Sequence, residues 1–193
     1  MLLGHFTKPL RNKPKQILMK KIIITYGLIA GLITMSFMIA STILVNHDID
    51  MNLCMLIGFT GMFIAFIFVF IGIKSYRDKY NNGVVSFGDA FKIGLSIALI
   101  ASCIYTLVWL IEFHFFFPDF MDKFSAKAIE DIRASTDLKA SEMSAKIAEM
   151  ETMRENYKNI LYRILYTMME ILPIGIVIAL VSALILKRKR KLA

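Results

Sequence analysis

Four long apolar blocks limit what this chain can fold into. They cover residues 22–45, 51–73, 93–117 and 164–186. An α-helix of about 20 apolar residues crosses the roughly 30 Å hydrocarbon core of a bilayer, so each block is long enough to span it. An isolated strand in lipid would leave backbone polar groups without partners, whereas a helix pairs them internally. The sequence therefore predicts an all-α protein with a four-helix transmembrane bundle.

The charged residues lie mostly between these blocks, and their sign alternates from one connection to the next. Residues 1–21, 74–92 and 187–193 are basic, 46–50 is acidic, and 118–159 carries seven basic and nine acidic residues. Because loops rich in Lys and Arg stay in the cytoplasm, we expect both termini to be cytoplasmic. The net charge of +8 then reflects orientation and contact with the lipid bilayer, and we expect no nucleic-acid binding.

The basic start followed by an apolar run also fits a signal peptide. The run 22–45 is too long for one, and no small-x-small cleavage pattern follows it. We therefore expect an uncleaved first span. Met19, followed by two lysines, resembles a natural start, which leaves open whether residues 1–18 belong to the native protein.

Short motifs predict how the spans begin and pack. Asn81-Asn82-Gly83 is a turn signal. Ser86 and Asp89 have the spacing of a capping box, which predicts that the third helix starts near Phe87. Gly27 and Gly31 form a small-residue face on which another helix can pack closely. For this pair, packing within the chain is favoured over dimerisation.

Residues 118–159 form the one substantial segment outside the apolar blocks. Pro118 ends the third span, and apolar residues then recur at helical spacing in two stretches. Together they predict an extracytoplasmic amphipathic helical hairpin between the third and fourth spans. The alternative is a layer lying on the lipid surface, which the mixed charge disfavours. Neither Gly nor Pro occurs in 119–172, so the sequence allows the second helix to continue unbroken into the fourth span.

Several runs carry a family resemblance. They are KSYRDKYNNGVVSFGDAFKIGLSIALIAS, PDFMDKFSAKAIEDI, EMETMRENYKN and MEILPIGIVIALVSALILKRK. In order and spacing they resemble domain-of-unknown-function family 4199, small four-span membrane proteins from Bacteroidetes. The resemblance covers about residues 20–190 and leaves out the N-terminal extension. It implies localisation to the bacterial inner membrane and brings no activity, substrate or catalytic residue.

Ionisable residues within the spans are the candidate polar site, because a charge in lipid is costly and often functional. Glu112 falls on the small-residue face of the third span, so we expect it to point into the bundle, with His114 off that face. Arg163 and Glu170 share one face of the fourth helix. The two carboxylates could share a proton or bind a cation. The favoured alternative is a structural clamp, in which Arg163 or His114 neutralises a carboxylate or the carboxylate is protonated and hydrogen-bonded.

Catalytic, metal and cofactor motifs are missing from the sequence. Cys54 and Cys103 lie inside apolar blocks, as packing residues do. Met143, Met150 and Met153 could be read as soft-metal ligands, but their helical spacing favours packing. We therefore expect no enzyme activity, no cofactor and no metal.

Two functions remain open. The favoured one is a non-enzymatic envelope component in which residues 119–158 contact an envelope protein or a second copy of the chain. The motive is that this segment is helical, amphipathic and poor in reactive groups. The alternative is a small oligomeric transporter or ion-coupled carrier that uses the intramembrane carboxylates Glu112 and Glu170.

Overall fold

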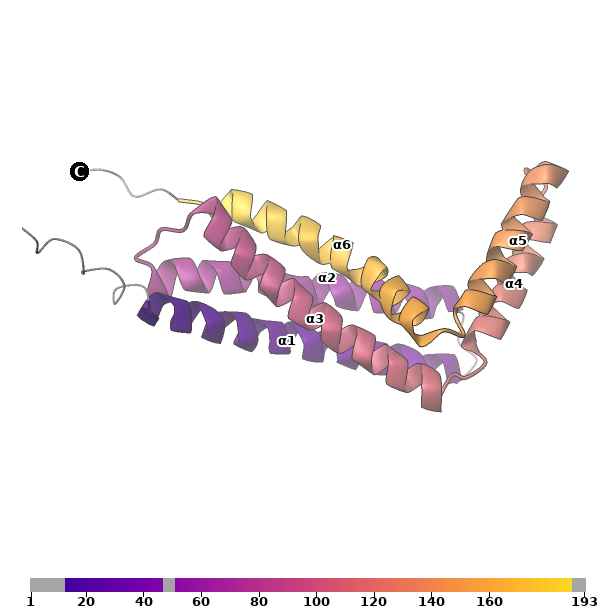
Figure 1. Cartoon of the computed structure of the whole chain (residues 1–193), viewed down its shortest axis with the longest axis horizontal. Coiled ribbons are helices and arrows are strands. Elements are labelled where there is room, and N and C mark those ends of the chain that lie inside the picture. The colour runs from indigo at the N-terminus through magenta and orange to yellow at the C-terminus, as the bar shows by residue number, and fades with distance from the viewer. Residues whose placement is uncertain (1–12, 47–50, 189–193) are drawn as a thin grey trace, which may run out of the picture. The chain divides into compact units, whose positions relative to one another are not determined.

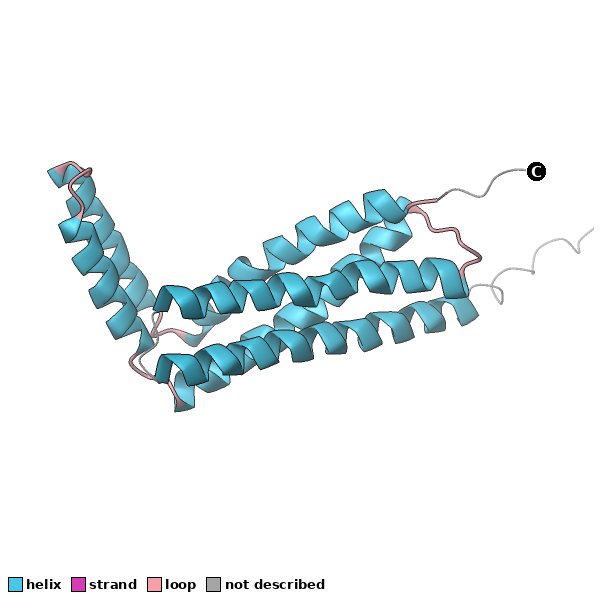
Figure 2. Ribbon diagram, turned by 180° about the vertical axis from the view of Figure 1, so that it is seen from behind, coloured by secondary structure: helices cyan, strands magenta, loops and turns pink. Residues whose placement is uncertain are grey.

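The described part of the chain, residues 13–46 and 51–188 of a computed structural model, consists of helices joined by short links, with one isolated β-bridge (Figure 1, Figure 2). The elements are α1 (Lys13–Asn46), α2 (Met51–Ser75), η1 (Tyr76–Tyr80), α3 (Phe87–Phe115), α4 (Phe120–Ala134), α5 (Ala140–Asn156) and α6 (Ile160–Leu186). Four helices, α1, α2 with η1, α3 and α6, are long and apolar enough to cross a membrane. The predicted all-α class with four spans is confirmed.

Some predictions fall outside the described residues. These are the basic start of the chain, the turn between the first two spans and the end of the basic tail, together with the side chain of Cys54.

The chain divides into two compact units. Within the described residues, the first contains 13–46, 51–105 and 171–188, and we call it the span unit. The second contains 106–170, and we call it the hairpin unit. Helices α3 and α6 each pass from one unit into the other, so the hairpin unit consists of the end of α3, all of α4 and α5, and the start of α6.

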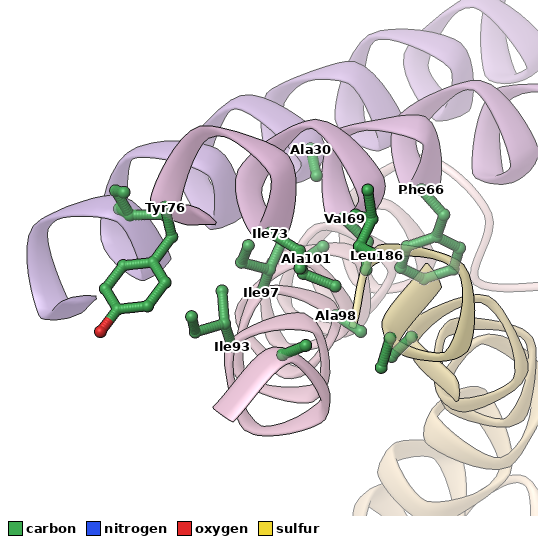
Figure 3. Close-up of a cluster of buried hydrophobic side chains, with 14 of the residues drawn as sticks. Ala30, Phe66, Val69, Ile73, Tyr76, Ile93, Ile97, Ala98, Ala101 and Leu186 are labelled. Atoms are coloured by element: carbon green, nitrogen blue, oxygen red, sulfur yellow. The ribbon is translucent and has the colours of Figure 1, made fainter. Parts of the chain in front are cut away.

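The core of the span unit lies mainly between α2, α3 and α6, and Ile22 and Ala30 of α1 also belong to it (Figure 3). Phe66 of α2 is fully buried there. A Cβ atom added to Gly175 of α6 would lie 2.8 Å from Cβ of Ala98 and 3.0 Å from Cζ of Phe66. Small residues thus let the helices approach closely, which is how helices associate in lipid, where no hydrophobic force drives them together.

Helix α1 packs on α3 through its glycines. A Cβ on Gly27 would lie 2.8 Å from Cβ of Ile100, and one on Gly31 would collide with the side chain of Ile104. The small-residue face is therefore occupied from within the same chain.

The connection between α2 and α3 follows its sequence signals. Asn82 and Gly83 have φ of 54° and 74°, the left-handed region that a tight turn uses. The backbone N–H of Asp89 donates to the hydroxyl of Ser86 at 3.1 Å, and α3 begins at Phe87. The predicted turn and helix start are confirmed. Val85 also pairs with Arg188 in an antiparallel bridge, which ties this connection to the end of α6.

Helices α4 and α5 form the hairpin. Met121 and Ser125 of α4 are buried, and Asp122 forms a 2.6 Å ion pair with Arg154 of α5. The three methionines of α5, Met143, Met150 and Met153, are half-buried. The helical hairpin that the periodicity predicts is present, and its turn occupies residues 135–139.

One prediction about the hairpin is wrong. Helix α5 ends at Asn156 and α6 starts at Ile160, so the second helix does not run unbroken into the fourth span. The side-chain Oδ1 of Asn159 accepts a 2.9 Å hydrogen bond from the backbone N–H of Leu161. An asparagine in this position is an N-cap, which starts a new helix without any Gly or Pro.

Candidate functional site

A cluster of aromatic rings, which we call the aromatic joint, holds the base of the hairpin. Its members are Trp109, Phe113, Phe120, Tyr157, Tyr162 and Tyr166. At its centre, Nε1 of Trp109 donates a 2.8 Å hydrogen bond to Oη of Tyr157. The ring of Phe113 lies 5.5 Å from that of Tyr157, and the ring of Phe120 lies 5.0 Å from Trp109. These are distances at which aromatic pairs attract one another.

Local structure explains why these rings meet. Trp109 and Phe113 are four residues apart in α3, as Tyr162 and Tyr166 are in α6, so each pair lies on one helix face. Tyr157 lies in the break between α5 and α6. Phe120 is the first residue of α4, and Tyr157 directly follows the last residue of α5, so the joint gathers both ends of the hairpin with α3 and α6.

Tyr157 is the most enclosed member, with 5% of its surface exposed. Burial raises the pKa of its phenol, and the charge of Glu170 raises it further. Hydrogen bonds with Trp109 and with Thr167 act in the opposite direction without cancelling the rise in pKa. The phenol is therefore neutral at physiological pH, and its oxygen accepts the hydrogen bond of Trp109.

Arg163, a predicted site residue, lies beside the joint. The carbon of its guanidinium is 4.3 Å from the centre of the Phe113 ring, a cation–π contact. Its Nε atom is buried and has no hydrogen-bond partner among the described residues.

The predicted carboxylates occupy different environments. Glu112 is buried, with 5% of its surface exposed. The backbone carbonyl of Glu112 accepts hydrogen bonds of 2.8 and 3.0 Å from the backbone N–H groups of Phe116 and Phe117, at the end of α3. Glu170 is exposed on the surface of the chain, and so is His114, whose ring meets the ring of Phe115 edge-on.

The distance between charges along each helix fixes the depth of these groups. The charge-free stretch 93–111 of α3 is about 29 Å long at 1.5 Å per residue. The stretch 171–186 of α6 is about 24 Å long by the same rise. A hydrocarbon core of roughly 30 Å leaves Glu112 at one edge and Glu170 within about one helical turn of it. Trp109 precedes Glu112 by three residues, so we expect the aromatic joint to lie near this edge of the core, where Trp and Tyr concentrate.

Metal chemistry receives no support from the described residues, where no three His, Cys, Asp or Glu side chains come together. Met143, Met150 and Met153 of α5 are half-buried.

Comparison with known proteins identifies the family of the chain. The model of a family described as "Protein of unknown function (DUF4199)" matches residues 25–188. The chain belongs to this family. The resemblance read from the sequence is thus confirmed, and this DUF4199 protein is a multi-pass membrane protein by its four long apolar helices. No curated protein and no solved structure matches it.

Sequence reasoning missed the central pair of this DUF4199 protein. Trp109 is the one tryptophan of the chain, and it lies in the last two turns of α3. Tyr157 lies in the break between α5 and α6, and nothing in the periodicity marks that break. The signals that could have pointed to the pair are the lone Trp and the grouping of Tyr157, Tyr162 and Tyr166 near the start of one span.

Proposed function

We propose that this protein is a non-enzymatic component of the bacterial inner membrane whose hairpin, α4 with α5, is the contact surface for a protein of the cell envelope. The observation that carries the proposal is the Trp109–Tyr157 hydrogen bond. It fastens the base of the hairpin to the end of a membrane span. A partner held by the hairpin would thereby be linked to the end of that span.

The surface of the hairpin fits a binding role better than a catalytic one. Helix α5 has no buried residue, and α4 exposes Lys127, which pairs with Glu130 at 3.4 Å and with Asp131 at 3.1 Å. Exposed pairs of this kind add little stability. They leave a surface of mixed charge, which is suited to a polar, non-obligate interface.

The orientation follows from charge. The basic segments flank the ends of the spans opposite the hairpin, and the positive-inside rule puts both termini in the cytoplasm. The hairpin then lies on the outer side of the membrane, where an envelope partner would meet it.

Crosslinking in native membranes tests this function. The ion pair Asp122–Arg154 sets the register of the hairpin, so residues 126 and 150 lie at the same level. Replacing 127–149 by a short Gly/Ser linker would remove the outer hairpin and keep the aromatic joint. We expect mass spectrometry to identify an envelope protein with the intact chain and to miss it with the shortened one. A partner retained by the shortened chain, or none with either, contradicts the proposal.

A second candidate, an ion-coupled carrier, rests on buried polar groups of α3. Glu112 is buried in a span, and the hydroxyls of Ser102 and Thr106 on the same helix are buried without hydrogen-bond partners among the described residues. Buried polar atoms of this kind in a membrane often mark an ion path. Proton or cation flux into vesicles containing the purified protein, abolished by Glu112→Gln, would favour the carrier over the envelope component.

A further inference from the structure

A group of charged side chains lies where α2 and α6 end, and we call it the basic cluster. It consists of Lys74, Arg77, Asp78 and Arg188. Two contacts bring these distant segments together. Val85 and Arg188 exchange backbone hydrogen bonds of 3.2 and 2.9 Å. Nη1 of Arg77 lies 3.4 Å from the carbonyl oxygen of Leu186, a residue 109 positions further along the chain.

The one carboxylate of the basic cluster is already occupied. Nε and Nη2 of Arg77 contact the two side-chain oxygens of Asp78 at 2.6 and 3.1 Å, a two-point ion pair. The charges of Lys74 and Arg188 also act on Asp78. Neither of these two residues forms a close ion pair of its own within the part of the chain that the structure describes. Positive charge at this place is therefore in excess.

The depth of the basic cluster indicates what can neutralise this excess. Lys74 directly follows the charge-free stretch 51–73, and Lys187 and Arg188 follow the charge-free stretch 171–186. Lys74 and Arg188 are both exposed. Charged residues at the end of an apolar stretch long enough to span the bilayer lie at the depth of the lipid headgroups.

The apolar surface next to the basic cluster fits the order of a phospholipid. Ile71 and Ile67 precede Lys74 by three and seven residues, so all three lie on one face of α2. Both isoleucines are exposed. A lipid whose phosphate contacts Lys74 would therefore extend its acyl chains along apolar side chains toward the middle of the bilayer.

We propose that the basic cluster binds the headgroup of an anionic phospholipid without an amine, of the phosphatidylglycerol class. Lys74 and Arg188 contact its phosphate. Arg77 is a positioning residue, because it is paired with Asp78 and contacts the end of α6. All of these residues belong to the span unit, so the proposal does not depend on what the hairpin binds.

Charge argues against two other occupants. An ethanolamine headgroup carries an ammonium group, and the carboxylate that could accept it is paired with Arg77 through both oxygens. The ammonium would lie beside Lys74 and Arg188, where like charges repel. A second copy of the chain, related by a two-fold axis along the membrane normal, would place the basic cluster against itself at equal depth. That arrangement is unfavourable for the same reason.

Native mass spectrometry tests the choice of lipid. The full-length protein would be reconstituted with equal amounts of phosphatidylglycerol and phosphatidylethanolamine, extracted in mild detergent and weighed with its bound lipids. We expect phosphatidylglycerol to be retained in preference. Lys74→Gln and Arg188→Gln should each lower that preference about fivefold, the effect typical of one basic residue near anionic lipid. Lys74→Arg keeps the charge and should preserve the preference.

A matched control separates a site from general attraction by basic connections. Lys92→Gln removes an exposed positive charge near the start of α3, outside the basic cluster, and should leave the preference unchanged. An equal loss in Lys92→Gln would overturn the proposal. So would equal retention of both lipids by the unmodified chain. Retention of phosphatidylglycerol that added inorganic phosphate abolishes would also overturn it, because the site would then hold a soluble anion.

One variant should strengthen lipid binding. Asp78→Asn removes the carboxylate that pairs with Arg77, so the basic cluster gains one positive charge. We expect a higher preference for phosphatidylglycerol in the same measurement. Damage to the fold would lower the retention of this lipid, so a gain cannot be produced by misfolding. An unchanged or lower preference in Asp78→Asn would contradict the proposal.

Discussion

Nε1 of Trp109 and Oη of Tyr157 lie 2.8 Å apart in a hydrogen bond that joins residues 48 positions apart in the chain. One residue belongs to the end of a membrane span and the other to the link between the hairpin and the next span. Because every other ring of the aromatic joint packs on or next to this pair, the bond is the point through which the base of the hairpin is held.

Removing the Tyr157 hydroxyl should destabilise the protein measurably. Tyr157→Phe leaves the ring in place but leaves the indole N–H of Trp109 without its acceptor. An unpaired donor in a buried site costs about 1–3 kcal/mol. We expect a lower thermal unfolding midpoint in detergent. Tyr162→Phe, which removes a hydroxyl from the edge of the same cluster, should change the midpoint little. Equal midpoints for the two variants would contradict the central role of the pair.

Alkaline pH should also destabilise the protein, through ionisation of the Tyr157 hydroxyl. The pKa of Tyr157 lies above its ordinary value of 10.0, chiefly because burial disfavours the phenolate. A raised pKa stabilises the folded state fully below the unfolded-state value, and that contribution is lost as pH rises through the folded-state value. The difference in unfolding midpoint between the unmodified protein and Tyr157→Phe should therefore shrink above about pH 10. A difference that stays constant up to pH 12 would show that Tyr157 does not titrate with unfolding.

Two glycine-to-alanine variants distinguish the effect of close helix packing on stability from the effect of helix propensity. Gly27→Ala places a Cβ 2.8 Å from Cβ of Ile100, so α1 and α3 must move apart. Gly58→Ala meets nothing within 4 Å and should be neutral or stabilising by up to about 1 kcal/mol, since Ala favours helix more than Gly does. Thermal unfolding of both variants checks this, with Gly27→Ala expected to unfold at a lower temperature. The reverse order would rule out close packing of α1 on α3 at Gly27.

The hairpin ion pair should matter only modestly. Asp122 and Arg154 are both half exposed, 56% and 50%, and exposed pairs contribute less than about 1 kcal/mol. Asp122→Asn should therefore speed hydrogen exchange in α5 slightly, and more at low salt than at high salt. The exchanged pair Asp122→Arg with Arg154→Asp should restore the slower rate. Failure of the exchanged pair to do so would mean that the register of the hairpin rests on packing alone.

The sequence predicts most of the fold because few backbone structures can span a bilayer. Helices that cross a membrane are long, apolar and bounded by charge, and the turn at Asn82 and the helix start at Phe87 follow from strong local signals. The break after Asn156 is a different case. It depends on a side-chain cap by Asn159. Periodicity alone does not distinguish a capping asparagine from one on the polar face of a continuous helix.

The candidate site was only partly predictable for a related reason. Charge inside an apolar block is visible in the sequence, so Glu112, Arg163 and Glu170 could be singled out. Which of them is buried depends on the rotation of each helix and on what packs against it, and Glu112 is buried whereas Glu170 is exposed. The aromatic joint combines residues far apart in the chain, and no local pattern brings Trp109 to Tyr157.

The turn at 135–139 lies at the far end of the hairpin from the aromatic joint. Seven residues added to α4 and seven to α5 would lengthen the hairpin by about 10.5 Å along its axis and keep the same faces together. The rings at its base and all four spans would be unaffected. Evolution can therefore adjust the reach of this protein by changing a short tip, without redesigning the part that sits in lipid.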